Sequence, residues 1–206
     1  MNNKVIQPFH GQETVCLVGP CKNHLSLGQF SKNQLIYIDG GAKHSKNVKD
    51  DFIIGDNDSF KQSDLDFNVL FSSQKDFSDL KGALEILSEK QKYIYLSGFS
   101  GGRLDHFMCV FGECFEHLNR FKNSIIYLNN SITILPQGTH TLELNAEFSL
   151  ICFDSNIISL SGNILYPCEG ITVYPASSRL LSNEANGKFS LTCSAPIALI
   201  KDKYCD

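Results

Sequence analysis

The first half of the chain contains short runs of consecutive apolar residues, several of them ended by glycine or aspartate. Short continuous runs of this kind are typical of strands that are buried on both faces of a sheet. Gly and Asp directly after a run indicate the turn that follows the strand. We therefore predict strands at Val15–Val18, Leu35–Ile38, Phe52–Ile54, Val69–Phe71, Tyr93–Leu96 and Ile125–Leu128.

Two helical patterns separate the last three of these runs. One begins at Ser78, a good N-cap residue, and places the apolar side chains of residues 80–87 on one face. The other follows Gly101 and Gly102, and its apolar residues recur at helical spacing over residues 107–118. Strands that alternate with helices indicate right-handed βαβ units. We therefore predict an α/β domain over residues 1–129, with a mainly parallel sheet flanked by helices.

The pattern changes near residue 130. From there the chain shows short runs rich in Ile, Thr, Leu, Phe and Tyr, broken by Gly, Asn, Pro and Ser, with no sustained helical period. Closely spaced runs of this kind indicate an all-β domain over residues 130–206, a β-sandwich or a barrel. Its expected strands are Ile132–Leu135, Thr139–Leu144, Phe148–Phe153, Ile157–Leu160, Ile171–Tyr174, Phe189–Cys193 and Ile197–Ile200.

Composition and charge narrow the classes of function. The chain has 206 residues, of which 42% are hydrophobic and 19% are charged, so it has enough apolar material for a core and too little charge for a disordered chain. The net charge of −4 argues against a protein that covers nucleic-acid phosphates. Nine acidic side chains but only five lysines lie between residues 39 and 79, so the acidic surplus is concentrated there.

No membrane span or export signal is visible in the sequence. Every apolar run falls far below the roughly 18 residues that a membrane span requires, and the N-terminal segment lacks the apolar region of a signal peptide. We therefore expect a cytoplasmic protein with no membrane partner. None of the eight cysteines forms a CxxC pair, so we expect free thiols that behave as small apolar residues, without disulfides or a zinc site.

Acidic turns follow two of the predicted strands. Asp39 comes directly after one strand, and Asp56 and Asp58 follow the next. The carboxyl ends of the strands in an open parallel sheet form the ligand-binding edge, and two carboxylates two residues apart can converge on one cation such as Mg²⁺. Solvated turns are the alternative, because Asp, Asn, Gly and Ser are ordinary turn residues. Asp79, in the first turn of a predicted helix, becomes a metal candidate only in combination with Asp56 and Asp58.

A glycine-rich segment precedes the second predicted helix. Gly101 and Gly102 would let backbone N–H groups approach an anion, and Arg103 could bind a phosphate through its guanidinium fork. A flexible loop with a surface arginine is the alternative. We add His106 to the nucleotide-binding candidates, although a lone histidine is more often a packing or capping residue. The sequence contains neither a P-loop nor a GxGxxG dinucleotide motif, and it has no GxSxG elbow.

Taken together, these motifs resemble those of the thiamin pyrophosphokinase family in order and spacing. The resemblance rests on Asp39-Gly40-Gly41-Ala42, Gly55–Ser59, Lys75–Asp79, Gly101–His106 and the late Ser182-Asn183-Glu184. It implies transfer of a pyrophosphoryl group from ATP to the hydroxyl of thiamin, which releases AMP. It also implies a homodimer, with thiamin bound at the subunit interface between the α/β domain of one subunit and the β domain of its partner.

The resemblance further assigns roles to individual residues. Nucleotide binding falls to the first glycine motif and the later glycine-arginine segment, and Asp105 is expected near the reacting hydroxyl, where it or Asp79 accepts the proton. Asn183 is expected in the β-domain part of the substrate site with Ser182, and Tyr166 could stack on the thiamin ring or simply pack in the sandwich. The implied Mg²⁺ ligands are Asp56, Asp58 and Asp79. The implied nucleotide-binding residues are Asp39, Gly40, Gly41, Gly101, Gly102 and Arg103.

Two alternatives stay open at this point. A related pyrophosphokinase could act on another alcohol, such as a hydroxymethyl-pterin, because nothing in the N-terminal half separates the two. A protein that binds thiamin or nucleotide without catalysis is the other alternative, although acids at several strand ends exceed what binding alone requires.

Overall fold

The computed structural model describes residues 9, 11–22, 25–56 and 68–201. The chain forms two compact units, and the division between them falls inside a helix: residues 1–113 and 128–130 make up the first unit, and residues 114–127 and 131–206 the second. The whole is a mainly β fold with few helices. No helix in the described part of the chain is long and apolar enough to cross a membrane.

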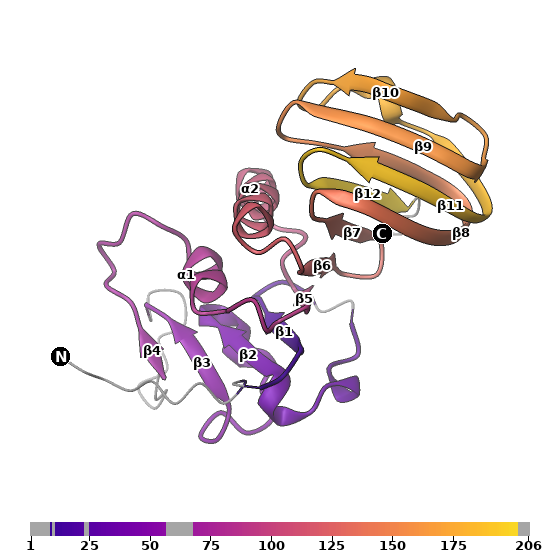
Figure 1. Ribbon diagram of the computed structural model, residues 1–206. Helices are drawn as coiled ribbons and strands as arrows, with labels where there is room; N and C mark the ends of the chain where they lie inside the picture. Colours follow the sequence, from indigo (N-terminus) through magenta and orange to yellow (C-terminus); the bar gives the residue numbers. More distant parts are fainter. Residues whose placement is uncertain (1–8, 10, 23–24, 57–67, 202–206) are drawn as a thin grey trace. The chain divides into compact units, whose positions relative to one another are not determined.

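The first unit contains a sheet of parallel strands in the order β4-β3-β2-β1-β5 (Figure 1). Each strand lies where the apolar runs predicted one, so continuous apolar runs did indicate buried parallel strands. The bounds are β1 Thr14–Val18, β2 Leu35–Ile38, β3 Phe52–Gly55, β4 Val69–Leu70 and β5 Tyr93–Ser97.

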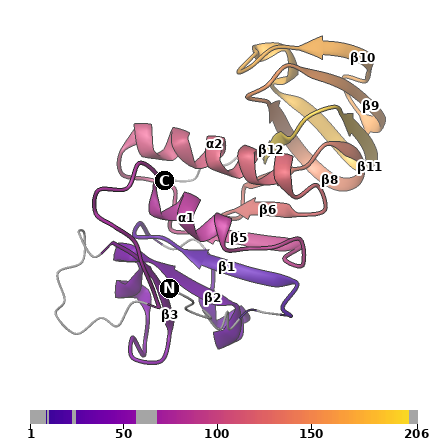
Figure 2. The ribbon, with the colours of Figure 1, turned by 60° about the vertical axis from the view of Figure 1, so that its left-hand side comes forward.

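Helices cover this sheet differently from the prediction. Helix α1, Asp79–Glu85, lies along one face (Figure 2), and α2, Leu104–Arg120, begins after the glycine segment as expected. Short 3₁₀ turns, not α-helices, supply the cover on the face that carries Cys16 and Tyr37, where Leu27 and Phe30 pack. These 3₁₀ turns are Leu27–Gln29 (η1) and Lys32–Gln34 (η2). Each follows a serine N-cap and is only three residues long, too short for an α-helix.

The second unit is built from antiparallel strands in the order β10-β9-β11-β8-β12-β7. A short 3₁₀ turn, η4, spans Ser178–Leu180 before β11. The strand bounds are β6 Ile125–Leu128, β7 Ile132–Leu135, β8 Gly138–Ile151, β9 Asn156–Ile164, β10 Cys168–Val173, β11 Asn183–Cys193 and β12 Ile197–Lys201.

Several strands of this unit are longer than predicted, β8 and β11 most of all. The runs expected at Thr139–Leu144 and Phe148–Phe153 are parts of one strand, β8, and β11 begins six residues before the expected Phe189. The polar residues between the runs do not form turns. They alternate along β8 with less exposed residues, because successive side chains of a strand point to opposite faces.

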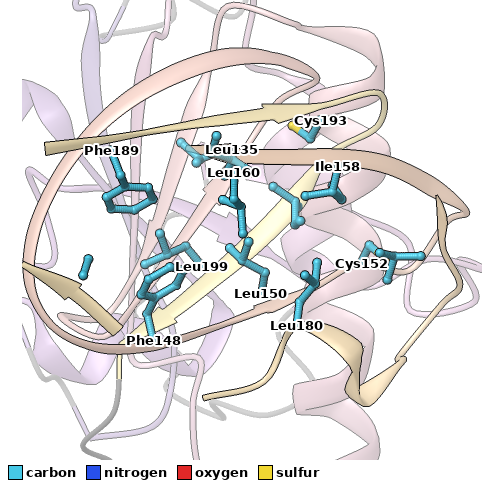
Figure 3. Close-up of a cluster of buried hydrophobic side chains, with 14 residues drawn as sticks. Leu135, Phe148, Leu150, Cys152, Ile158, Leu160, Leu180, Phe189, Cys193 and Leu199 are labelled. Atoms are coloured by element: carbon cyan, nitrogen blue, oxygen red, sulfur yellow. The ribbon is translucent and has the colours of Figure 1, made fainter. Parts of the chain in front are cut away.

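The core of the second unit gathers side chains from several strands around one interior. Phe148 of β8 and Phe189 of β11 stack with their ring centroids 5.2 Å apart, and Leu160 and Leu199 come from neighbouring strands (Figure 3). All seven described cysteines are free thiols, as predicted, and Cys152 and Cys193 belong to this core. The functions predicted for residues 1–129 and 130–206 stay predictions.

The first unit packs its strand ends so tightly that one glycine cannot be replaced without movement. A Cβ atom at Gly41 would lie 2.0 Å from the carbonyl oxygen of Val18, so we expect Gly41→Ala to lower the free energy of unfolding by about 2 kcal/mol or more. Gly112→Ala is the control, because nothing lies within 4 Å of the added Cβ. Alanine in this exposed helical position should stabilise the protein by about 0.5–1 kcal/mol. Equal stability of the two variants in urea unfolding would contradict the packing.

Candidate functional site

The candidate site begins where the loops after β1, β2 and β5 approach one another closely. Gly41 packs against the backbone of Val18, and a Cβ at Gly19 would lie 2.5 Å from the carbonyl oxygen of Gly98. The Gly19 N–H also donates to the carbonyl oxygen of Ser97 at 2.7 Å. The glycines therefore bring the carboxyl ends of these strands together, which is where an open parallel sheet binds its ligands.

Asp39, at this edge of the sheet, has an unusual backbone conformation and a buried carboxylate. It follows β2 and opens the 3₁₀ turn Asp39–His44 (η3), which also holds the buried Gly40 and Gly41. Its φ of 42° is in the left-handed region that non-glycine residues rarely adopt, and the residue is only 7% exposed. Its Oδ1 atom accepts no hydrogen bond from the described residues. A buried acceptor without a donor is costly, so this carboxylate is suited to a ligand that supplies a donor or a cation.

Lys75 links two other acidic candidates of the site, Asp56 and Asp79. Its ammonium forms an ion pair with Oδ2 of Asp56, directly after β3, and a second with Oδ1 of Asp79 at 3.1 Å. The side chains of Lys75 and Asp56 are 8% and 6% exposed, and that of Asp79 is 22% exposed. The ammonium also lies 5.8 Å from the centroid of the Phe71 ring, within the range of a cation–π contact. One cation is thus shared by two carboxylates.

Burial and the shared ion pairs together set the pKa shifts of Lys75 and Asp79. Burial lowers the pKa of Lys75, but its hydrogen bonds to Asp56 and Asp79 outweigh burial and raise the pKa overall. Burial also raises the pKa of Asp79; the Lys75 ammonium opposes that rise, while the negative charges of Asp56 and Asp39 add to it. The pKa of Asp79 stays above its ordinary value mainly because burial disfavours the charged carboxylate more than the ammonium favours it.

Asp79 is held by the start of α1. Ser78 is the N-cap, as predicted, and its hydroxyl accepts the N–H of Lys81 at 3.0 Å while donating to Glu113 at 2.6 Å. This cap fixes the first turn, and the i,i+4 spacing from Lys75 to Asp79 brings the ammonium to the carboxylate. The helix start therefore positions the acid that the sequence assigned to it.

The acidic groups suit Mg²⁺ by their chemistry, although they surround a lysine. Carboxylate oxygens are the ligands that Mg²⁺ prefers, and the buried Oδ1 of Asp39 is an acceptor without a donor. Among the described residues, no three His, Cys, Asp or Glu side chains stand close enough to hold a metal ion. Asp58, the remaining predicted ligand, lies outside the described residues.

Arg103 and Asp105 form a second ion pair near the start of α2. The Arg103 guanidinium binds both carboxylate oxygens of Asp105, with Nε 3.1 Å from Oδ1, and the backbone N–H of His106 donates to the same oxygen at 3.0 Å. All three residues are exposed. The hydrogen bond from Arg103 lowers the pKa of Asp105 to about 2. Gly101 and Gly102 precede the pair with φ values of 101° and 70°, so the loop uses conformations that favour glycine.

The residues predicted in the β domain meet within the second unit. Asn183 is buried, and its side-chain oxygen accepts the backbone N–H of Tyr166 at 3.0 Å and that of Glu184 at 2.9 Å, while its Nδ2 donates to the carbonyl oxygen of Tyr166 at 3.0 Å. Asn183 therefore holds the Tyr166 loop, whose ring is 61% exposed. Ser182 has an exposed side chain and a φ of 54°, a conformation that non-glycine residues adopt mainly under constraint.

Lys75 belongs to the Lys75–Asp79 motif, but the sequence analysis gave its side chain no role. Its signal was available: it lies four residues before Asp79 and follows a segment with an acidic surplus. Helical i,i+4 pairs of opposite charge attract, but Lys75 lies before the helix, where periodicity gives no guidance.

These features place a lysine between two carboxylates near the carboxyl ends of parallel strands, in a mainly β fold. The model of the family described as "Thiamin pyrophosphokinase, catalytic domain" matches residues 29–127. A curated relative, thiamine pyrophosphokinase of Bacillus subtilis (strain 168), is 29% identical over 131 residues, which are 59% of this chain and 61% of the relative. The chain thus matches about three fifths of the length of this relative.

Solved structures show the same fold. Thiamine pyrophosphokinase from Bacillus subtilis is similar with a TM-score of 0.72 at 20% identity, and the match covers 93% of this chain and all of that one. Thiamin pyrophosphokinase from Candida albicans matches with a TM-score of 0.72 at 16% identity, over 98% of this chain and 95% of that one. The match of residues 29–127 and the curated relative confirm the resemblance to the thiamin pyrophosphokinase family that the motifs carry.

The hydrogen bonds of Asn183 give a first prediction at the site. Asn183→Ala removes the hydrogen bonds of a buried amide and leaves the backbone N–H and C=O of Tyr166 without these partners, so we expect it to lower the free energy of unfolding by about 2 kcal/mol. Asn186→Ala, at an exposed position of the same strand, should change it by less than about 0.5 kcal/mol. Thermal and urea unfolding measure both. A loss no larger than that of the control would contradict the role of Asn183 in holding the loop.

The Arg103–Asp105 pair gives a second prediction. The Asp105 carboxyl should titrate near its pKa of about 2 in the unaltered protein, and in Arg103→Met the midpoint should rise toward its ordinary value of 3.8 because the guanidinium hydrogen bond is lost. Carboxyl ¹³C NMR measures the midpoint. Arg120→Met, at the other end of α2, should leave it unchanged. A midpoint that stays near 2 in Arg103→Met would show that another group depresses the pKa of Asp105.

Proposed function

We propose that the protein is a thiamin pyrophosphokinase that transfers the pyrophosphoryl group of ATP to the hydroxyl of thiamin, giving thiamin diphosphate and AMP. The observation that carries the proposal is that the matched segment, residues 29–127, contains Asp39 and the ion pairs of Lys75 with Asp56 and Asp79. Buried acids at the carboxyl ends of parallel strands suit a ligand that brings a cation with its phosphates. No observation favours a pterin alcohol or a purely binding role.

In this proposal Mg²⁺ is held by Asp56, Asp58 and Asp79, with Asp39 close by. The bound cation neutralises charge on the triphosphate and orients it for attack. The chain's own part is positioning: β3 ends at Asp56, the Ser78 cap fixes Asp79, and the close packing of Gly41 fixes the loop that follows Asp39. Such preorganisation makes a large contribution to phosphoryl transfer.

Arg103 is proposed to bind the phosphates together with the N–H groups of Gly101 and Gly102, and His106 lies beside them at the start of α2. The exposed guanidinium can exchange one carboxylate for a phosphate, which binds the same fork. Asp105, with a pKa of about 2, is a weak proton acceptor. We therefore assign Asp105 to holding Arg103 beside the substrate.

Thiamin is proposed to bind to the second unit, whose antiparallel strands around one core have the character of a β-sandwich. The exposed ring of Tyr166 suits stacking on a cationic ring, and Ser182 offers its hydroxyl beside it, with Asn183 holding the loop. As the family resemblance implies, we propose a cytoplasmic homodimer in which the partner subunit's α/β domain completes the thiamin site.

The direct test is to incubate the protein with ATP, Mg²⁺ and thiamin and to follow both products. We expect AMP and thiamin diphosphate to form in equal amounts, and neither to form when Mg²⁺ is chelated. AMP release with a pterin alcohol but not with thiamin would assign the first alternative. Thiamin binding without AMP would assign the non-catalytic one.

The acidic cluster gives a prediction for this activity. Asp56→Asn removes a proposed cation ligand and one partner of Lys75, so kcat should fall by at least about a hundredfold. Circular dichroism should show that the fold is retained. Asp50→Asn is the control, because its exposed pair with Lys32, at 3.7 Å, is far weaker, and it should keep near-normal kcat. Near-normal turnover of Asp56→Asn at saturating Mg²⁺ would contradict the assignment.

A further inference from the structure

Lys75 is the one charged group of the cluster that the proposed reaction does not use. Its side chain is almost fully buried, and its ammonium lies between the carboxylates of Asp56 and Asp79. An isolated buried carboxylate is strongly unfavourable, so these acids require a cation whether or not a metal ion is present. The lysine supplies one from within the chain.

We propose that Lys75 is an internal counter-ion that occupies the place of the divalent cation between Asp56 and Asp79 and gives it up when the cation arrives with the nucleotide. Lys75 is then a positioning residue, which keeps the acids folded in place and makes the site a weak one for a free divalent cation. The proposal rests on the proposed function, because that function assigns the cation to these acids.

The charges favour this role over a purely structural ion pair. A structural pair matches one ammonium with one carboxylate, but here one ammonium serves two. Oδ1 of Asp39 has no donor among the described residues, and Asp39 is only 7% exposed. Among the described residues, Asp56 and Asp79 share one ammonium, and an incoming cation can take its place between them.

The surroundings of Lys75 allow the ammonium to move without losing all of its contacts. The Phe71 ring lies 5.8 Å from the ammonium and offers an aromatic face to a cation. This ring packs edge-on against Phe77 with centroids 5.4 Å apart, and a Cβ at Gly82 would lie 2.5 Å from it, so its position is fixed. A lysine has a flexible stem with four carbons, which lets the ammonium leave the carboxylates while staying near the ring.

The experiment measures Mn²⁺ affinity in the absence of nucleotide, from the electron paramagnetic resonance signal of free Mn²⁺. In Lys75→Met and Lys75→Gln the dissociation constant should fall by about tenfold or more, because the competing positive charge is gone. Lys75→Arg keeps the charge and should bind Mn²⁺ as the unaltered protein does. Lys92→Met is the matched control: it removes a lysine from an exposed pair with Glu13 and should not change the affinity.

Each outcome decides the proposal. Unchanged or weaker Mn²⁺ binding in Lys75→Met and Lys75→Gln would overturn it, as would equal tightening in Lys92→Met, which would reveal a general charge effect. If the neutral variants unfold in EDTA, the proposal requires that Mn²⁺ or Mg²⁺ restore their folding, and failure to do so overturns it. Tighter binding in a protein that makes no thiamin diphosphate would refute the proposed function alone, and normal synthesis without tighter binding would refute only the role of Lys75.

Discussion

The ammonium of Lys75, shared by the carboxylates of Asp56 and Asp79, is the interaction on which the candidate site depends. Both carboxylates lie at the carboxyl ends of secondary-structure elements or at a helix start, where the parallel sheet directs them to one edge. Burial there makes an uncompensated negative charge expensive. The lysine offsets that cost, and without a cation at this position the acids would have to become protonated or turn toward solvent.

Two ion pairs of the first unit differ in burial, and the pKa of the carboxyl group shifts in opposite directions in the two pairs. Arg103 and Asp105 are exposed and paired one to one, so the carboxyl is strongly acidic and the pair can open cheaply. Lys75 is buried and outnumbered, and the pKa of Asp79 is raised despite the neighbouring ammonium.

The sequence predicted the strands of the first unit well, because runs such as Phe52–Ile54 can only be buried on both sides. It also predicted the helix start at Ser78, since capping is a local property of the chain. It failed where the outcome depends on distant residues. The polar residues inside β8 looked like breaks, but pairing with β11 keeps them in the strand.

At the candidate site, too, the sequence marked residues whose place is set locally and missed those that only the fold brings together. Asp39, Asp56 and Asp79 were found because each stands at the end of a strand or the start of a helix, where the local pattern marks it. Lys75 stands in a connecting segment, and its importance appears only when the fold carries it to Asp56, 19 residues away. Asn183 was predicted in the substrate site, which stays a prediction, and in the structure its amide also holds the backbone of Tyr166 and Glu184. No sequence pattern distinguishes these two uses of an asparagine.

The most direct measurement is a crystal structure of the protein with Mn²⁺ and a non-hydrolysable ATP analogue, with the metal located by its anomalous scattering. The account predicts Mn²⁺ bound by Asp56 and Asp79, the triphosphate on the same metal, and the Lys75 ammonium displaced from between the two carboxylates. A structure in which Lys75 still joins Asp56 to Asp79 while the metal and the nucleotide bind elsewhere would contradict it.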